Sequence, residues 1–480
     1  MVFEPVIGLE IHSQLRSRTK IFCGCSTAFG APPNTLVCPV CLGLPGALPV
    51  LNRRVVDLAI KAAVALGCTV HTESVFSRKN YFYPDLPKGY QISQYDRPLA
   101  TGGRVDVSSG DETTRVRLTR IHLEEDAGKS LHHGWPDSDR STHVDFNRSG
   151  VPLIEIVTEP DLRSAGDAAE CFSRLREILV ALGVNDGNME EGSLRCDANV
   201  SVRASGEARL GTKTEVKNVN SFRYLQKAIE FEIARQVAVI EQGGSITQET
   251  RLWDTESGQT LPMRSKEEAH DYRYFPEPDL APLRVDTAWV DAITKTLPEL
   301  PEARKARLIA THGLGEYDAD LLVRLMTGGA DYFEAMVAGG APPKAASNWI
   351  QGEVQRKLKD AGADDMAAVP VPPEALADLV VLVDAGRVSS SVAKHVFETM
   401  WNTGSPAATI IDDEGLAQVA DESALEALVS AAIDEHPRAV VQFKAGKKNA
   451  FGFLVGQVMK ASQGKADPKI VSRLLQKALE

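Results

Sequence analysis

The chain has 480 residues, of which 43% are hydrophobic and 25% charged, and its formal net charge is −12. This length predicts two to four domains, and the balance of residue types is that of a soluble globular protein. The acidic charge excludes a global basic field for binding nucleic acid, although a local basic patch is compatible with it.

The first residues of the chain and its number of cysteines indicate the cellular compartment in which the protein is expected to reside. Residues 1–5 (MVFEP) carry no basic region followed by an apolar one, so we expect no secretory signal. The sequence has no apolar run of about 18 residues, so we expect no transmembrane helix. Seven cysteines in a chain this long do not make a disulfide scaffold. Together these features predict a reducing, cytoplasmic setting.

The first motif in chain order is a cluster of four cysteines. A CxC pair is followed after twelve residues by a CxxC pair, and the four thiols belong to Cys23, Cys25, Cys38 and Cys41. Paired motifs at this spacing predict a tetrahedral zinc ion held by four thiolates. Because four thiolates leave no open coordination position, we expect this zinc to be structural. The other cysteines lie in apolar or strand contexts and are interpreted as core residues: Cys68, Cys171 and Cys196.

The first 290 residues mix short strands with helices. Alternation of apolar and polar residues predicts strands over 6–15, 114–120, 143–146, 197–203 and 212–219. Helical spacing predicts helices over 52–66, 165–182 and 221–243. Since strands and helices are segregated, we expect an α+β domain built on an antiparallel sheet rather than a doubly wound fold.

The rest of the chain is predicted to be helical. Pro301 lies in the first turn of a new helix, and residues 361–373 read as a linker. We therefore expect domains at 1–293, 294–372 and 373–480. Asp467, followed by proline, is the predicted N-cap of the last helix. The last 37 residues hold eight Lys or Arg against two acids, which indicates a binder of phosphate backbones, with a solvated helix face as the alternative.

Three adjacent carboxylates, Glu124, Glu125 and Asp126, follow the strand predicted at 114–120. Carboxylates this close repel one another unless a cation lies among them; read alone, the triplet is more simply a solvated turn. Strand alternation points Glu125 opposite to its two neighbours. We expect Glu125 to face inward, with Lys129 just beyond the turn as a phosphate contact.

Other acids lie inside predicted strands. Glu10 and His12 are two residues apart on one strand face, where they either bind a divalent cation or form a hydrogen-bonded pair. Glu155 interrupts an apolar strand, and a buried carboxylate is costly unless it is paired or coordinated. The alternative to a metal ligand at this position is a salt bridge between Glu155 and Arg148.

Two further strand faces carry both charges. Arg195 and Asp197 share one face, and Lys213, Glu215 and Lys217 share another. A site for a nucleoside triphosphate requires acids that bind Mg²⁺ and cations that bind phosphates, and these strand faces offer both. The simpler interpretation is that the two faces are solvent-exposed surfaces of the sheet. The segment 78–91 adds lysines among aromatic rings, which fits either base stacking or packing beneath a loop.

Several standard motifs are absent. The P-loop glycine required before Ala127-Gly128-Lys129-Ser130 is replaced by Leu123, and the chain has no GxGxxG, HExxH or GxSxG segment. Any nucleotide chemistry must therefore run on the carboxylate-rich antiparallel sheet.

Over essentially the whole chain the sequence resembles the B subunit of bacterial aspartyl/glutamyl-tRNA amidotransferases. The resemblance rests on long, specific segments at 7–12, 78–85, 123–129, 152–156, 190–199, 271–279 and 446–468. The cysteine cluster matches the zinc-bearing members of that family, and other members lack it.

The resemblance implies a fold and an activity. The N-terminal domain would be a cradle with a sheet like that of glutamine synthetase, followed by a helical domain and a helical tail of YqeY type that holds tRNA. The cradle would use ATP and Mg²⁺ to phosphorylate the side-chain carboxylate of glutamate or aspartate mischarged on tRNA(Gln) or tRNA(Asn). Ammonia released from glutamine by the amidase (glutaminase) A subunit would then replace the phosphate. A small C subunit would complete the heterotrimer, and a non-catalytic tRNA-binding scaffold is the alternative function.

The resemblance also implies roles for individual residues. The implied Mg²⁺ ligands are His12, Glu125 and Glu155, with a second acidic set of Glu10, Glu191 and Glu215. The implied catalytic and substrate-contacting residues are Glu125, Glu155, Lys79, Lys88 and Arg195. Lys88 is also an implied nucleotide contact, and the strand faces and the turn described above add four predicted contacts: Lys129, Asp197, Lys213 and Lys217.

Overall fold

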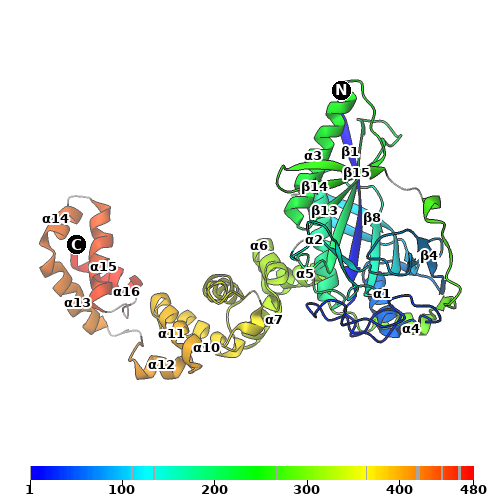
Figure 1. Ribbon diagram of the computed structural model, residues 1–480. Helices are drawn as coiled ribbons and strands as arrows, with labels where there is room; N and C mark the ends of the chain where they lie inside the picture. Colours follow the sequence, from blue (N-terminus) through cyan, green and yellow to red (C-terminus); the bar gives the residue numbers. More distant parts are fainter. Residues whose placement is uncertain are drawn as a thin grey trace. The chain divides into compact units, whose positions relative to one another are not determined.

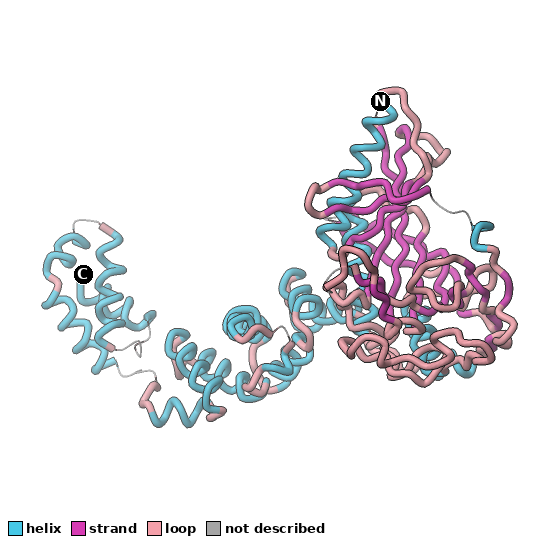
Figure 2. The backbone as a smooth tube through the Cα atoms, viewed as in Figure 1, coloured by secondary structure: helices cyan, strands magenta, loops and turns pink. Residues whose placement is uncertain are grey.

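The computed structural model describes residues 2–479 except 110–111, 133, 135, 266–268, 364, 418–421, 445–446, 463–465 and 467. The chain forms two compact units, Met1–Leu300 and Pro301–Glu480. The first unit holds the strands and the second is helical, as the strand and helix colours show (Figure 2). This arrangement of a mixed unit before a helical one is the order that the sequence predicts.

A ten-stranded sheet is the framework of the first unit (Figure 1). Its strand order is β15-β14-β13-β12-β1-β11-β8-β6-β2, with β7 paired to β8. The strands are β1 (Phe3–Gln14), β2 (Thr69–Val70), β6 (Ala100–Thr101), β7 (Arg104–Ser109), β8 (Glu112–Glu125), β11 (Pro152–Thr158), β12 (Leu194–Ala204), β13 (Thr214–Val219), β14 (Glu249–Asp254) and β15 (Gln259–Ser265).

One strand pair departs from the expected antiparallel sheet. β13 and β14 run parallel, whereas the other pairs described in this sheet are antiparallel. The reason is the helix between them, α3 (Phe222–Glu241), because parallel neighbours need a crossover connection that a short hairpin cannot supply. The sheet is therefore mixed.

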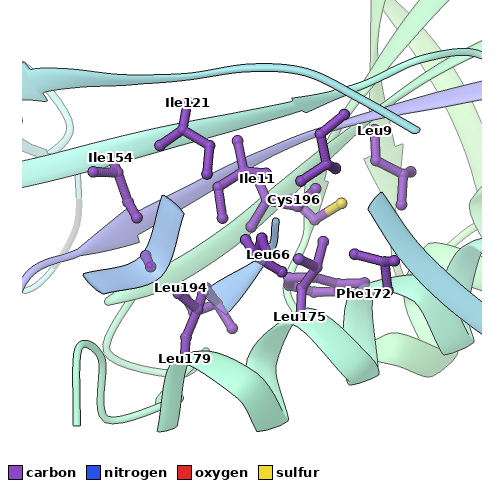
Figure 3. Packing of buried hydrophobic residues seen from close by; sticks show 14 of the residues in the cluster. Leu9, Ile11, Leu66, Ile121, Ile154, Phe172, Leu175, Leu179, Leu194 and Cys196 are labelled. Atoms are coloured by element: carbon purple, nitrogen blue, oxygen red, sulfur yellow. The ribbon is translucent and has the colours of Figure 1, made fainter. Parts of the chain in front are cut away.

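Helices cover one face of this sheet. Strand alternation places Leu9, Ile11 and Ile154 on that face, where they belong to one buried cluster with Phe172, Leu175 and Leu179 of α2 (Ala165–Ala181), as Figure 3 shows. The helices α1 (Arg53–Ala65), α2 and α3 begin as predicted, because Asn52, Ser164 and Ser221 cap them through their side chains. The opposite face of the sheet carries the polar residues.

Short elements complete the first unit. They form a three-stranded sheet of order β16-β4-β5 and the pairs β10-β9 and β17-β3. Their bounds are β3 (Glu73–Ser74), β4 (Ser77–Asn80), β5 (Tyr90–Ser93), β9 (Lys129–Leu131), β10 (His143–Asp145), β16 (Phe275–Pro276), β17 (Leu283–Arg284), η1 (Ala269–Tyr272) and α4 (Thr287–Thr294).

The second unit is a series of helices with two separate hydrophobic cores. The first core extends from Leu308 to Ile411 and the second from Leu425 to Leu479. The domain boundary expected at residue 372 therefore falls inside the first core. The predicted N-cap Asp467 lies outside the described residues. Among the described residues, no helix has both the length and the apolar character needed to cross a bilayer.

The helices of the second unit have the following bounds: α5 (Pro301–His312), α6 (Glu316–Asp320), η2 (Leu321–Leu325), α7 (Gly329–Ala338), α8 (Pro343–Trp349), η3 (Ile350–Val354), α9 (Gln355–Asp360), η4 (Met366–Ala368), α10 (Pro373–Asp384), α11 (Ser390–Thr403), α12 (Ala407–Asp413), α13 (Glu422–Glu435), α14 (Pro437–Lys444), α15 (Lys448–Ala461) and α16 (Pro468–Leu479).

Candidate functional site

Three adjacent strands bring histidines and carboxylates together on the polar face of the sheet. On the middle strand, β11, Glu155 lies in register with His12 of β1 on one side and with His122 of β8 on the other. Glu124 lies two residues beyond His122 and so shares its face. Side chains directly opposite on neighbouring strands are within contact distance, so this register forces the four groups to converge.

His12, Glu124 and Glu155 form a cluster that we call the histidine–carboxylate triad. The His12 Nε2 atom lies 3.7 Å from Glu124 Oε1 and 3.6 Å from Glu155 Oε2. His122 Nε2 lies 3.3 Å from the same Glu155 oxygen. One ligand atom from each triad residue falls within 4.8 Å of the others, a spacing that suits a shared divalent cation.

The electrostatics of the triad are those of a buried charged cluster. Burial by itself would raise the pKa of Glu155, but the neighbouring His122 and His12 lower it well below its usual range. Burial likewise opposes the charge of His122, yet the two carboxylates raise its pKa to about 9. Positive charge is therefore favoured among these carboxylates, and the protonated imidazole of His122 supplies it here.

The structure corrects the expected role of Glu125. Its carboxylate lies on the opposite side of β8, where it forms an ion pair with Lys88 and accepts a hydrogen bond of 2.9 Å from the Ile92 amide. The expectation that Glu125 faces His12 and Glu155 is wrong, because Glu125 alternates in phase with the buried Leu123 of the apolar face. Glu124 takes that place in the triad.

Arg148 also differs from its expected partner. Its guanidinium lies 3.6 Å from Asp126 and donates to the carbonyls of Ala127 and Gly128. The alternative of a Glu155–Arg148 salt bridge is wrong, because Glu155 is held instead by the two histidines.

A second polar cluster lies on β1, β12 and β13. Lys217 forms an ion pair with Asp197 and lies 3.4 Å from Glu215, whereas Glu10 accepts a hydrogen bond of 2.8 Å from Asn199. The charges of Asp197, Glu215 and Glu10 raise the pKa of Lys217 against the opposing effect of burial. Glu10 and Glu215, two members of the expected second acidic set, thus lie near the ammonium group of Lys217.

Glu191, the third expected member of that set, lies in the turn before β12. Together with Lys129 and Arg148 it lines a cleft of about 470 Å³ at the end of the central strands. The Lys129 ammonium lies 5.0 Å from the ring centroid of Phe29 in this cleft. Lys213, the other expected phosphate contact, is exposed just before β13.

Arg195 adds a positive charge beside the triad. It stands in register with His12, and its Nη2 atom lies 3.1 Å from Asp126. The charge of Asp126 raises the pKa of this guanidinium. Its buried Nε atom has no hydrogen-bond partner within the described part of the chain. A buried donor without a partner is costly, and a bound anion would satisfy it.

Lys79 lies among tyrosines from two segments. Its ammonium is 4.8 Å from the ring centroid of Tyr272 and 5.8 Å from that of Tyr81. Burial opposes its charge, but the carboxylates of Glu124 and Glu155 contribute to raising its pKa. Lys79 is therefore a fixed cation that faces the triad from the short β4 strand.

The four expected zinc ligands converge as predicted. One sulfur from each of Cys23, Cys25, Cys38 and Cys41 lies within 4.8 Å of the others. Cys38 Sγ and Cys41 Sγ are 3.9 Å apart, close to the roughly 3.8 Å edge of a tetrahedron with Zn–S bonds of about 2.3 Å. A hydrogen bond from the Cys23 thiol and the charge of Lys20 lower the pKa of Cys41 to about 4. The donor set fits zinc.

Sequence reasoning missed two members of the histidine–carboxylate cluster. It did not select His122 and Glu124, although His122-Leu123-Glu124 has the same alternation as Glu10-Ile11-His12. The buried Leu123 between them marks the apolar phase of the strand. Because alternate residues of a strand share a face, Leu123 indicates that Glu124 and Asp126 face the polar side and that Glu125 does not.

Two family models match the chain. The model of the GatB/GatE catalytic domain matches residues 5–291, and the model of the GatB domain matches residues 331–479. The first covers the unit that contains the triad and the cysteine cluster, and the second covers most of the helical unit.

Curated proteins are similar over the full length. The B subunits of aspartyl/glutamyl-tRNA(Asn/Gln) amidotransferase are 51% identical in Persephonella marina, 52% in Geobacter sulfurreducens and 53% in Chlorobium phaeobacteroides. Each alignment spans 480 residues and covers 100% of both chains.

Proposed function

The chain belongs to the family of aspartyl/glutamyl-tRNA(Asn/Gln) amidotransferase B subunits, a family of ligases, and on that premise we propose that its first unit activates an aminoacyl-tRNA with ATP. The side-chain carboxylate of Glu-tRNA(Gln) or Asp-tRNA(Asn) is phosphorylated, and ammonia then replaces the phosphate. Phosphorylation is needed because a carboxylate is a poor acyl donor. The observation that carries this proposal is the histidine–carboxylate triad on the polar face of the sheet.

The acidic and basic residues of that face have different proposed roles. His12, Glu124 and Glu155 would hold Mg²⁺, which neutralises charge on the transferred phosphoryl group. Lys79 and Arg195 present fixed positive charges beside the triad and would contact phosphate or the substrate carboxylate. The Lys217 cluster, with Glu10, Asp197 and Glu215, is the proposed second cation-binding region, because its lysine occupies a place that suits a cation.

The remaining parts have proposed supporting roles. The four-cysteine cluster holds a structural Zn²⁺ that stiffens the base of a cradle like that of glutamine synthetase. The last helices form a YqeY-like tail that binds tRNA through their lysines and arginine. The amidase A subunit supplies the ammonia, and a heterotrimer forms with a small C subunit.

The reconstituted enzyme tests this proposal. The chain, with the A and C subunits, Mg²⁺, ATP, glutamine and Glu-tRNA(Gln), is expected to produce Gln-tRNA(Gln), and Asp-tRNA(Asn) is assayed in parallel. A Glu124→Gln, Glu155→Gln double variant is expected to lose tRNA-dependent ATP turnover while the amidase still hydrolyses glutamine. Normal amidation by this variant would contradict the assignment of the triad.

A non-catalytic tRNA-binding scaffold is the competing function. It predicts ATP turnover at background whether or not mischarged tRNA is present. A scaffold gains nothing from two buried carboxylates held against histidines, because even a paired buried cluster is typically no more stabilising than well-packed apolar residues. Mischarged tRNA that stimulates ATP turnover only in the wild type would exclude the scaffold.

A further inference from the structure

Lys20 is a buried cation whose partners are unusual. It is 0% exposed and is among the largest fully buried side chains. Its Nζ atom donates to the Leu36 carbonyl at 2.8 Å and to the Phe146 carbonyl at 3.4 Å, and it lies 3.6 Å from Cys41 Sγ. None of the ion pairs found among the described residues involves Lys20. A buried ammonium without a negative partner is strongly unfavourable.

The cysteine cluster supplies the missing negative charge. Zinc(II) bound by four thiolates has a formal excess of two negative charges. The sulfur nearest Lys20 belongs to Cys41, the buried member of the cluster, whereas the other three cysteines are partly exposed. An ammonium group that donates to one of these sulfurs offsets part of that excess and lowers the cost of burying both groups. The burial of Lys20 is thus explained by a centre in its anionic, four-thiolate form.

Lys20 also connects the two halves of the cluster to the sheet. Its backbone amide donates to the Cys25 carbonyl at 2.9 Å, while its side chain contacts Cys41. The neighbouring Ile21 amide donates to the Gly150 carbonyl at 3.0 Å, and Ser149 Oγ donates to the Cys41 carbonyl at 3.1 Å. Residues 146–151 lead directly into β11, the strand that carries Glu155.

We propose that Lys20 is the positioning residue that compensates the charge of the four-cysteine centre and joins it to the loop 146–151. The inference rests on the zinc centre proposed above. Outer groups of this kind typically change metal affinity by about 10- to 100-fold when they are removed. Lys20 therefore sets the affinity of the centre without being one of its ligands.

The test uses the full-length chain with Zn²⁺ and, separately, with Co²⁺. Lys20→Met keeps the length and removes the charge, and Lys20→Gln keeps a donor without the charge. Lys61→Met is the matched control, because Lys61 also donates to a carbonyl, that of Leu182 at 2.6 Å, in another part of the same unit. Zinc affinity is measured by chelator competition, and thiolate-to-cobalt charge-transfer bands report the electron density on sulfur.

Both Lys20 variants are expected to lose about 10- to 100-fold in zinc affinity. Their cobalt bands should move to lower energy, because a sulfur without the nearby ammonium is a stronger electron donor. The Lys61→Met protein should match the wild type in both measurements. Wild-type zinc affinity in either Lys20 variant would overturn the inference, and so would weaker zinc binding with unchanged cobalt bands. Neither result would contradict the proposal that the four cysteines bind zinc. A wild-type chain that binds no zinc would overturn both.

Discussion

At the scale of single residues, adjacent carboxylates at the end of β8 have different environments. Glu124 faces His12 and the polar side of the sheet, whereas Glu125 faces Lys88 on the other side. Asp126 returns to the polar side and pairs with Arg195 and Arg148. A strand places neighbouring side chains on opposite faces, so each carboxylate of the triplet acquires a different partner.

This separation predicts different effects of two similar substitutions. Glu124→Gln replaces a proposed oxygen ligand of the Mg²⁺ ion. The Mg²⁺ concentration needed for tRNA-dependent ATP turnover should therefore rise. The rise should exceed the ~10- to 100-fold that is typical when a residue supporting a metal ligand is removed. Glu125→Gln should leave that Mg²⁺ requirement within about threefold of the wild type, because its carboxylate faces away from the triad. Magnesium titrations of both variants provide the measurement, and equal shifts in the two would contradict the assignment.

At the scale of elements, a buried polar network fastens the crossover helix α3 to the edge of the sheet. Glu232 of α3 is 0% exposed and accepts hydrogen bonds from Thr214 at 2.7 Å and Thr260 at 2.9 Å. Arg235 donates to it at 2.6 Å, and Arg251 lies 3.4 Å away. This network joins α3 to β13, β14 and β15, the region that contains the parallel strand pair.

The network predicts an acid-sensitive stability of the first unit. Burial would raise the pKa of Glu232, but hydrogen bonds from Arg235, Gln236 and Thr214 outweigh it and lower the pKa. A lowered folded-state pKa contributes stability that is fully present above the unfolded value of about 4.3 and is lost as pH falls through the folded value. At pH 7, Glu232→Gln should cost about 3 kcal/mol. Arg235 loses its charged partner, and Arg251 is left with its ion pair with Glu249.

Thermal unfolding across pH 3.5–7 measures this effect. The difference between the wild type and Glu232→Gln should narrow as pH falls below the unfolded pKa of about 4.3. Glu230→Gln is the matched control, since Glu230 is exposed on the same helix and bonds only its neighbour Gln226 among the described contacts. A difference that stays constant with pH would contradict the role of the Glu232 charge.

Local patterns predicted the helices α1, α2 and α3 and the strands β1, β8, β12 and β13, but not the strands β14 and β15. The differences between prediction and structure have physical causes. The capping residues Ser164 and Ser221 mark the starts of α2 and α3 because they satisfy free backbone amides. The parallel pairing of β14 depends on where α3 packs, which local alternation does not encode. The prediction that Glu125 faces His12 and Glu155 is wrong, because alternation alone does not say which side of the strand is polar. The buried Leu123 on the same strand marks the apolar side, on which Glu125 also lies.

At the scale of the whole molecule, the polar clusters and the basic tail belong to parts of the chain with separate hydrophobic cores. The triad, the Lys217 cluster and the cysteine cluster all belong to the unit of residues 1–300. The helical unit has two cores, and the second begins at Leu425. Because residues up to Ile411 close the first helical core, the last helices can be removed without exposing it.

Deletion of residues 417–480 therefore predicts a selective loss of tRNA binding. The deleted segment contains the basic tail, whose described cations include Lys444, Lys460 and Arg473. Each lost phosphate contact should reduce the slope of log affinity against log salt concentration by roughly 0.7 to 0.9, the values for single strands and for duplex DNA. The truncated chain, assembled with the A and C subunits, should bind tRNA more weakly with a shallower salt slope. Glutamine hydrolysis by the amidase should persist, because that reaction does not use the tail. Filter binding at several salt concentrations measures the slope, and an unchanged slope would show that the tail makes no contact with the phosphate backbone.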